Sequence, residues 1–216
     1  MVNILSNSSS VINHFIGEIR DAEIQKDSMR FRKNLERLGE FFAYEISKEL
    51  EYEPKEVITS LGTAVVPMLK NYPVLAAILR AGLPVHQGFL NVFDKSENAF
   101  VSAYRKYHKD HTFTIQIEYS SVPDIDGKIL ILCDTMLATG TSAVLAYKEL
   151  LSHGKPKHTH IVSILASQEG LGYLKRNLPG KNLTVWIGTV DDELTAQAYI
   201  VPGLGDAGDL AFGKKI

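Results

Sequence analysis

The segment KILILC, residues 128–133, constrains the fold more than any other feature of this chain. A nearly unbroken apolar run of this kind is typical of a strand that is buried on both faces of a parallel sheet. The run ends at Asp134, passes through a loop of small residues and leads into the helical pattern SAVLAYKELLSHG, which closes at Gly154. Further apolar runs are VLAAIL (74–79), HIVSILAS (160–167) and LTVWIGTV (183–190), with a helix expected over about 171–178. Strands that alternate with helices in this way predict an α/β fold with a central parallel sheet flanked by helices.

Two further patterns in the sequence predict elements outside this set of strands and helices. In FRKNLERLGEFFAYEISKEL, residues 31–50, apolar side chains recur at three- and four-residue steps, which places them on one face of a helix. AFVSAY (99–104) and FTIQIEY (113–119) flank the polar linker RKYHKDHT, and together they predict a β-hairpin arm. No linker rich in Pro, Gly or Ser divides the chain, so we expect residues 1–216 to form one domain, with a helical extension over 1–50 and an arm over about 99–119.

The overall charge argues against several classes of partner. The 216 residues carry 23 Lys and Arg against 25 Asp and Glu, so a formal net charge of -2 gives no preference for nucleic acid or an anionic membrane. No stretch reaches the roughly 18 consecutive apolar residues of a transmembrane helix, and MVNILSNSSS lacks the pattern of a signal peptide. A lone cysteine, Cys133, cannot form an internal disulfide. We therefore expect a cytoplasmic protein in which Cys133 is a buried strand residue rather than a nucleophile.

The C-terminal segment VPGLGDAGD, residues 201–209, contains a match to the dinucleotide-binding pattern G-x-G-x-x-G. That pattern needs a following helix and an acidic residue about 20 positions later, whereas only eight residues follow Gly208. A dinucleotide site is excluded on length, and the glycines need another explanation.

The seven histidines raise the alternative of a metal site. His158 and His160 are two residues apart, and His108 and His111 are three apart in the charged linker, but neither pair has a Cys or acidic partner at structural-zinc spacing. Because metal sites need three or four convergent ligands, we expect these histidines on the surface or in linkers.

Two strand ends carry residues suited to an anionic ligand, and in open α/β sheets ligands bind at the carboxyl ends of strands. In DTMLATGTS, residues 139–142 lie where the chain turns into a helix, whose free backbone N–H groups and positive dipole end favour a phosphate. Plain N-capping by Thr or Ser explains the same residues. Asp134 favours a bound ligand over plain N-capping as the explanation, because a carboxylate there can accept hydrogen bonds from sugar hydroxyls. In ILRAGL (78–83), Arg80 offers a planar fork for a second anion beside two small residues.

These segments carry a resemblance to a known family. DTMLATGTS resembles the phosphoribosyl-diphosphate loop of type I phosphoribosyltransferases, and more narrowly the form DPMLATGGS of uracil phosphoribosyltransferases. ILRAGL is similar to that family's pyrophosphate loop, YRK around Arg105 to its hairpin-borne arginine, and YIVPGLGDAGD to its C-terminal uracil-binding signature. VINHFIGEIRD and FRKNLERLGEFFAYE resemble its N-terminal helices, so the resemblance covers nearly the whole chain.

The resemblance implies a type I phosphoribosyltransferase-like fold with a β-hairpin arm and a C-terminal base-binding hood over about 183–216. The implied activity is transfer of the phosphoribosyl group of 5-phospho-α-D-ribose 1-diphosphate (PRPP) to uracil, giving UMP and diphosphate in pyrimidine salvage. Implied catalytic residues are Arg80, Arg105, Asp134 and Asp206. Those implied to bind PRPP are Arg80, Ala81, Gly82, Arg105, Asp134, Thr135, Met136, Leu137, Ala138, Thr139, Gly140, Thr141, Ser142 and Asp206. Those implied to bind uracil are Ile200, Gly205, Asp206 and Ala207. Mg²⁺ is implied too, held through the diphosphate and water rather than by dedicated protein ligands.

The chain departs from the family pattern at several places. Thr135 stands where uracil enzymes usually carry Pro, and Thr141 replaces a second Gly. Purine-using relatives carry an acid at the position of Ala138, so its absence here favours a pyrimidine. The linker RKYHKDHTF differs from the acidic or proline-bearing versions of the family.

Other functions stay open at this point. One is a nucleic-acid-binding regulator of pyrimidine genes on the same fold, which would need a basic face with exposed aromatic residues. Another is a phosphoribosyltransferase for a different base, such as orotate or a purine, and a third is a catalytically silent relative. The resemblance also implies a homodimer or a higher homo-oligomer, with no nucleic-acid or membrane partner, and it leaves activation by GTP open.

Overall fold

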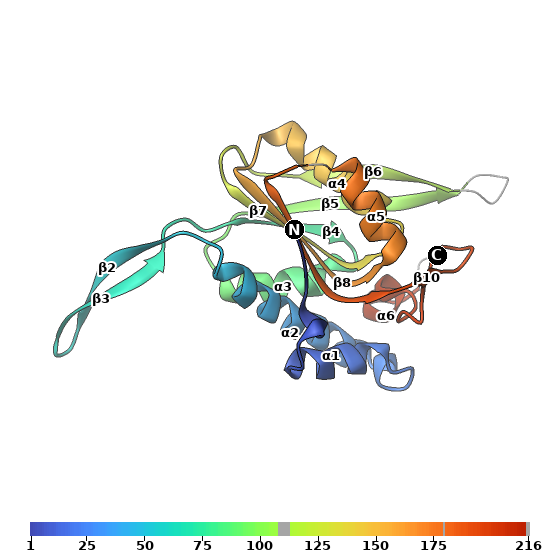
Figure 1. The fold of residues 1–216 in the computed structure, drawn as a ribbon, viewed down its shortest axis with the longest axis horizontal. Helices are drawn as coiled ribbons and strands as arrows, with labels where there is room; N and C mark the ends of the chain where they lie inside the picture. The colour runs from blue at the N-terminus through green and yellow to red at the C-terminus, as the bar shows by residue number, and fades with distance from the viewer. Residues whose placement is uncertain (108–112, 179, 215–216) are drawn as a thin grey trace.

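The computed structural model describes residues 1–107, 113–178 and 180–214, and its centre is a seven-stranded sheet (Figure 1). In order across the sheet, the strands are β1 (Val2–Ile4), β9 (Leu183–Asp191), β8 (His158–Ser167), β7 (Ile129–Leu137), β4 (Val74–Leu79), β5 (Asn98–Tyr107) and β6 (Phe113–Ser121). Neighbouring strands are parallel except β5 and β6, which are antiparallel. The predicted α/β fold with a central, mostly parallel sheet is confirmed.

Alternate residues along each strand face two separate cores. On β4, Leu75 and Ala77 pack in one core with the helices α1 (Val11–Arg20), α2 (Ser28–Ser47) and α3 (Gly82–Val92). Val74, Ala76 and Ile78 pack in the other core, with α4 (Thr141–Leu150) and α5 (Gln168–Asn177). Figure 1 shows these two groups of helices on opposite faces of the sheet. The apolar runs in the sequence are continuous because both faces of these strands are covered.

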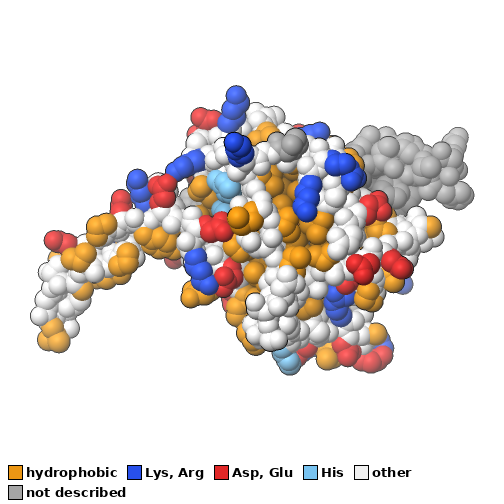
Figure 2. All heavy atoms as spheres, viewed as in Figure 1, with side chains coloured by type: hydrophobic (Ala, Val, Ile, Leu, Met, Phe, Trp, Pro, Cys, Tyr) orange, Lys and Arg blue, Asp and Glu red, His pale blue; other side chains and the backbone are white. Residues whose placement is uncertain are grey.

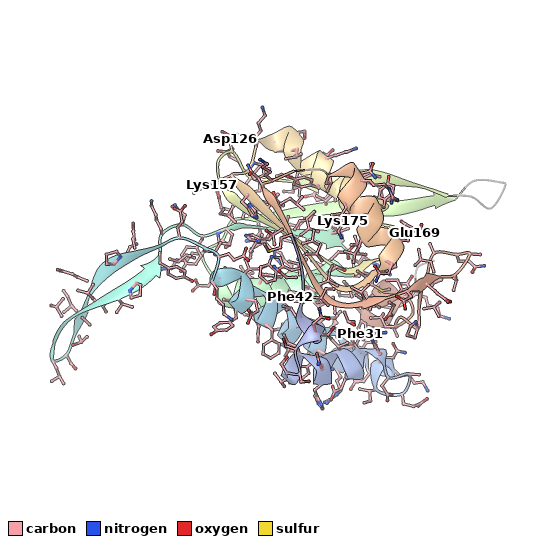
Figure 3. The ribbon with its side chains drawn as sticks, in the orientation of Figure 1. Phe31, Phe42, Asp126, Lys157, Glu169 and Lys175 are labelled. Carbon is pink, nitrogen blue, oxygen red and sulfur yellow. The ribbon has the colours of Figure 1, made fainter. Side chains whose placement is uncertain are left out.

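Helix α2 follows the spacing that the sequence predicts. Its buried apolar residues, of which Figure 3 labels the two phenylalanines, are Phe31, Leu35, Leu38, Phe42 and Ile46. Asp27 fixes the start of the helix, because its carboxylate accepts hydrogen bonds from the backbone N–H groups of Met29 and Arg30. The remaining helices are α6 (Ala207–Phe212) and the 3₁₀ turns η1 (Leu5–Asn7), η2 (Ile24–Lys26) and η3 (Leu151–His153). Within the described ranges, no helix is both long and apolar enough to cross a membrane.

Two hairpins extend beyond the helical layers, and only one was predicted. Strands β5 and β6 form the predicted arm, although β5 runs on to Tyr107 into the segment expected to be a linker, whose residues 108–112 lie outside the described part of the chain. The second hairpin, β2 (Tyr52–Thr59) with β3 (Gly62–Leu69), projects far from the body of the molecule (Figure 1). The region 1–50 also differs from expectation, since it opens with β1, which pairs in parallel with β9.

The histidines are only partly where the sequence placed them. His160 is 2% exposed inside β8, where its Nδ1 accepts a hydrogen bond from the indole Nε1–H of Trp186 at 3.0 Å, so the prediction of a surface histidine is wrong there. The side chain is buried because strand residues on this face pack under α2. Burial lowers the pKa of His160 to about 4. His108 and His111 lie outside the described residues.

Cys133 is a buried thiol, as expected, and burial raises its pKa.

Helices α2 and α3 approach each other through backbone at Gly88. A Cβ atom there would lie 2.0 Å from the carbonyl oxygen of Glu36 and 2.8 Å from the backbone nitrogen of Glu40. We expect Gly88→Ala to lower the free energy of unfolding by about 1–3 kcal/mol, measured by denaturant titration. Gly17→Ala is the control, because a Cβ on this exposed helical residue meets nothing within 4 Å. The control should raise the free energy of unfolding by about 0.5–1 kcal/mol; similar values for both variants would contradict the close contact.

Candidate active site

A cavity of about 180 Å³ lies where the carboxyl ends of β4 and β7 meet the C-terminal segment. Its lining residues are Ile78, Leu79, Arg80, Ala81, Ala103, Asp134, Met136, Leu137, Ala138, Thr139, Gly140, Ser142, Ala143, Ala198, Tyr199, Gly205, Asp206, Ala207 and Gly208. Strand β4 ends at Leu79 and β7 at Leu137. The ends of adjacent parallel strands lie on one edge of the sheet, which is why segments far apart in sequence meet here.

One wall of the cavity is the turn from β7 into α4. Gly140 caps the helix in the left-handed conformation, with φ 79°, and a side chain there would be strained and would meet the carbonyl oxygen of Gly170 at 2.7 Å. The Thr139 hydroxyl donates to Thr141 Oγ1 at 3.1 Å. The first N–H groups of α4 have no partner within the helix, so this wall presents donors and a positive dipole end to an anion.

Asp134 lines the cavity from within β7, which continues to Leu137 rather than ending at Asp134 as the sequence predicted, and the protonation of Asp134 is unusual for an aspartate. Burial raises the pKa of its carboxyl to about 7, although hydrogen bonds from the backbone N–H groups of Thr135 and Met136 act in the opposite direction. The Thr135 N–H lies 2.7 Å from Asp134 Oδ1. A carboxyl with this pKa changes charge near neutral pH, so its charge can respond to what binds beside it.

Arg80 enters the cavity from the opposite loop, directly after the cis peptide between Leu79 and Arg80. Its Nη2 donates to Asp209 Oδ1 and to the carbonyl oxygen of Gly213, both at 3.2 Å. Its Nε is buried and has no hydrogen-bond partner among the described residues. A buried N–H of a guanidinium without an acceptor is unfavourable, so the site has capacity for an additional oxygen ligand.

The third wall is the loop that leads into α6. Asp206 caps this helix, since its Oδ1 accepts the backbone N–H of Asp209 at 2.9 Å. Gly205 and Ala207 on either side line the cavity. Ile200, in the short strand β11 (Ile200–Val201) that pairs with β10 (Glu193–Leu194), is 3% exposed and packs in the core beside α2 instead.

A partly buried ion pair holds this C-terminal segment against the sheet. Arg20, the last residue of α1, donates from Nη1 and Nη2 to the two carboxylate oxygens of Asp191, each at 2.8 Å. The backbone N–H of Gly203 donates to the same carboxylate at 2.9 Å. Burial acts to raise the pKa of Asp191, but the hydrogen bonds from Arg20 and Gly203 outweigh it and hold the pKa below its usual value.

The cavity therefore brings together most of the residues singled out in the sequence, and it leaves some out. Gly82, Thr135, Thr141 and Ile200 do not line it. Thr135 is fully buried behind the wall, and a Cβ on Gly82 would lie 2.9 Å from the carbonyl oxygen of Cys133. The backbone of Arg105 belongs to β5, while its side chain is outside the described residues.

Sequence reasoning missed several lining residues, among them Ala103, Ala198, Tyr199 and Gly208. Tyr199 and Gly208 stand inside the motif YIVPGLGDAGD, so the motif itself contained the signal. Ala198 has a positive φ of 62°, a conformation that the sequence around an alanine does not predict.

Comparisons with known proteins agree with this geometry. The family model for uracil phosphoribosyltransferase matches residues 6–214. A Porphyromonas gingivalis protein named uracil phosphoribosyltransferase is 54% identical over 212 residues, covering 98% of each chain. A Pyrococcus furiosus protein of the same name is 35% identical over 211 residues, covering 96% of this chain and 88% of that one. The solved structure of protein AQ2163 from Aquifex aeolicus superposes with a TM-score of 0.86 at 32% identity, covering 99% of this chain and 98% of that chain.

The raised pKa of Asp134 makes a prediction about stability. The folded chain holds this proton more tightly than the unfolded chain, so the contribution of Asp134 to stability falls as pH rises from about 4 to about 7. Asparagine cannot ionise, and we expect the stability of Asp134→Asn relative to wild type to increase across this window, by on the order of a few kcal/mol. Denaturant titrations at several pH values measure the difference, with Asp94→Asn on an exposed loop as control. A difference that does not change with pH would contradict the burial of this charge.

Proposed function

The chain belongs to the uracil phosphoribosyltransferase family, and we propose that the cavity at the carboxyl edge of its sheet is where the reaction takes place. The enzyme transfers the phosphoribosyl group of PRPP to uracil, giving UMP and diphosphate in pyrimidine salvage. The bond between C1 of the ribose and the diphosphate oxygen breaks, a bond from C1 to N1 of uracil forms, and the N1 proton is released. The fold is that of type I phosphoribosyltransferases.

Two walls of the cavity bind the donor in this proposal. Residues 139–142 hold the 5′-phosphate through the N–H groups at the start of α4 and their hydroxyls, while Met136, Leu137 and Ala138 shape the wall beside it. Asp134 accepts hydrogen bonds from the ribose hydroxyls. Arg80 and the backbone at Ala81 and Gly82 bind the diphosphate. The buried, unpartnered Nε of Arg80 supports this assignment, because an oxygen of the diphosphate would satisfy it.

The third wall reads the base. Gly205 and Ala207 bring main-chain groups to the cavity, and N–H and C=O groups can pair with O2, N3–H and O4 of uracil. Cytosine carries an amine where uracil has O4, so it would leave buried backbone groups unpaired. Ile200 is packed behind this wall and acts by supporting it.

Arg105 and Asp206 complete the proposed set of catalytic residues. Arg105 lies on the β5–β6 arm, and an arginine there can close over the diphosphate as negative charge develops on the leaving group. Asp206 lines the cavity while its carboxylate caps α6, so it can orient the donor and hold the base-reading loop in one geometry. Holding donor and base in line is the main contribution of such a site.

The lining residues also fit a divalent cation bound together with the donor. They include two carboxylates, Asp134 and Asp206, against one guanidinium, that of Arg80. Among the described residues, no group of three or more His, Cys, Asp or Glu side chains could hold a metal by itself. This donor set suits Mg²⁺, which typically keeps several waters and binds through phosphates and one or two carboxylates. When bound, Mg²⁺ would share the charge of the diphosphate.

The observation that carries the proposal is the convergence of the two anion-binding loops and the C-terminal loop on one cavity. The test is an assay of uracil, cytosine, orotate and hypoxanthine in parallel, each with PRPP and Mg²⁺, with and without GTP. We expect UMP from uracil and no product from the other bases, and the GTP arm shows whether that nucleotide activates. Product from orotate or hypoxanthine would contradict the proposal. No product from any base, with retention of polyuridine RNA on a filter at low salt, would favour the nucleic-acid-binding regulator.

We place the enzyme in the cytoplasm, as a single domain over residues 1–216. The buried thiol of Cys133 fits a reducing compartment. The Arg20–Asp191 ion pair joins the N-terminal extension to the C-terminal hood, which supports one domain rather than two.

We also propose that the enzyme works as a homodimer or a larger homo-oligomer. Apolar side chains lie along the projecting β2–β3 hairpin (Figure 2). Ile58 is 88% exposed, Leu61 98% and Val65 67%. Exposed apolar residues concentrated on one projecting element are typical of an interface. A second copy of the chain is the partner we propose for it.

Replacing Ile58 and Leu61 together by Asp should dissociate this assembly. Charges at these tips would have to be buried without partners in the interface. Light scattering coupled to size-exclusion chromatography should give a dimer or larger species for wild type and a monomer for the double variant. Met29→Asp is the control, because it replaces a 59% exposed apolar side chain by a charge on α2, away from the hairpin. A monomeric wild type at micromolar concentration would refute the interface.

A further inference from the structure

Thr135 is a residue of the donor loop that does not reach the cavity. It lies in β7 between Asp134 and Met136, both of which line the cavity. Successive side chains on a strand point to opposite faces. Accordingly, Thr135 points away from the ligand and is 0% exposed. Any effect of this side chain on the reaction must pass through its neighbours.

Two hydrogen bonds connect Thr135 to groups on two different walls of the cavity. Its hydroxyl donates to the carbonyl oxygen of Ala81 at 2.6 Å. Its backbone N–H donates to Asp134 Oδ1 at 2.7 Å. One bond therefore reaches the loop of Arg80, and the other reaches the Asp134 carboxylate within β7. Proline at this position could make neither of them, since it has no hydroxyl and no backbone N–H.

The bond to Ala81 crosses a place where the sheet no longer joins the two walls. Residue pairing between β4 and β7 ends at Ala77 and Cys133. Beyond that pair β4 and β7 diverge and no longer pair with each other, β4 continuing to Leu79 and β7 to Leu137 before the loops that border the cavity. The hydroxyl of Thr135 fixes the Ala81 carbonyl, and because the peptide unit is planar, it also fixes the direction of the Gly82 N–H. Without the hydroxyl, the Ala81 carbonyl would lose this buried hydrogen bond.

We propose that Thr135 is a positioning residue that holds the diphosphate-binding loop at Ala81 in register with the ribose-binding carboxylate of Asp134. The proposal rests on the proposed function. Thr135 makes no contact with substrate. It acts by keeping the groups that bind the two parts of PRPP, at Ala81 and Asp134, at a fixed separation. PRPP spans both walls and uracil touches neither bond, so loss of the hydroxyl should affect the donor and leave the base nearly unaffected.

Thr135→Val is the direct test, because it keeps the shape and the backbone N–H and removes only the hydroxyl. We expect the KM for PRPP to rise about tenfold, and the Kd for PRPP measured by calorimetry without uracil to rise in parallel. The KM for uracil should stay within about twofold. Thr135→Ser restores a hydroxyl and should recover most of the affinity for PRPP. An unchanged KM for PRPP in Thr135→Val, or equal increases for both substrates, would overturn the proposal.

Thr135→Pro removes both hydrogen bonds, because proline has neither a hydroxyl nor a backbone N–H. Thr135→Val removes only the bond to Ala81. We therefore expect the KM for PRPP to rise more in Thr135→Pro than in Thr135→Val, while the KM for uracil stays within about twofold in both. Equal KM values for PRPP in the two variants would remove the bond to Asp134 from the proposal.

Thermal unfolding of every variant shows whether it folds. If Thr135→Val does not fold, Thr135→Ala and Thr135→Ser form a second pair that differs by the hydroxyl alone, and equal KM values for PRPP in that pair would refute the proposal. Failure of the proposed function is seen separately, because wild type would then form no UMP from uracil and PRPP.

Discussion

The ion pair between Arg20 and Asp191 determines where the C-terminal segment lies, and the cavity depends on that placement. Arg20 ends α1 and Asp191 ends β9, so the pair joins the first helical layer to the edge of the sheet. The same carboxylate binds the Gly203 N–H, which fixes the chain just before the loop at Gly205 and Asp206. Breaking a buried pair from one side typically costs about 3–5 kcal/mol, because the remaining charge has no partner. Arg32 adds a second tie, donating from Nη1 to the carbonyl oxygen of Ala211 in α6 at 2.6 Å. The wall proposed to read the base is thus held by contacts from the N-terminal helices.

The sequence predicted those elements whose burial leaves a periodic pattern. KILILC and VLAAIL became central strands because two cores cover them, and Phe31 to Ile46 became one face of α2 because that face meets the sheet. The β2–β3 hairpin left no such pattern. Apolar and polar residues alternate only where one face of a strand is buried, and nearly every residue of this hairpin is exposed within the chain. With three residues, β1 is too short for any period to show. His160 was misplaced because burial under α2 is a tertiary property, which a pair of histidines on one strand does not reveal.

The candidate site was predictable at the level of loops and not at the level of side chains. Thr139 and Arg80 follow the ends of β7 and β4, and Asp134 lies in the last four residues of β7. The carboxyl ends of parallel strands share an edge, so the convergence of these residues follows from topology alone. Whether a given residue of such a loop faces the ligand depends on its backbone direction. Thr135 alternates with two lining residues and turns inward, and Ile200 is drawn into the core by its apolar side chain. Ala198 reaches the cavity through a left-handed backbone conformation that no local signal marks. The sequence motifs therefore predicted which loops border the cavity, whereas packing determines which side chains of each loop face it.

Hydrogen bonds from side-chain hydroxyls to backbone carbonyls hold the two donor loops, and in the proposed function Arg80 is the group that changes partners. The Thr135 hydroxyl fixes Ala81, and the Ser167 hydroxyl, which also caps α5, donates to the carbonyl oxygen of Ala138 at 2.5 Å, so the two donor loops are each tied to a neighbouring strand. Arg80 instead binds Asp209 and the Gly213 carbonyl oxygen through one nitrogen, and its side chain is about one third exposed. A diphosphate carries more negative charge than Asp209 and presents several oxygens, so it competes well for the guanidinium. Donor binding would then release Asp209, two residues after Ala207 in the base-reading helix. In the proposed function, the hydrogen bonds of Arg80 to Asp209 and Gly213 therefore connect the group assigned to the diphosphate with the wall assigned to the base.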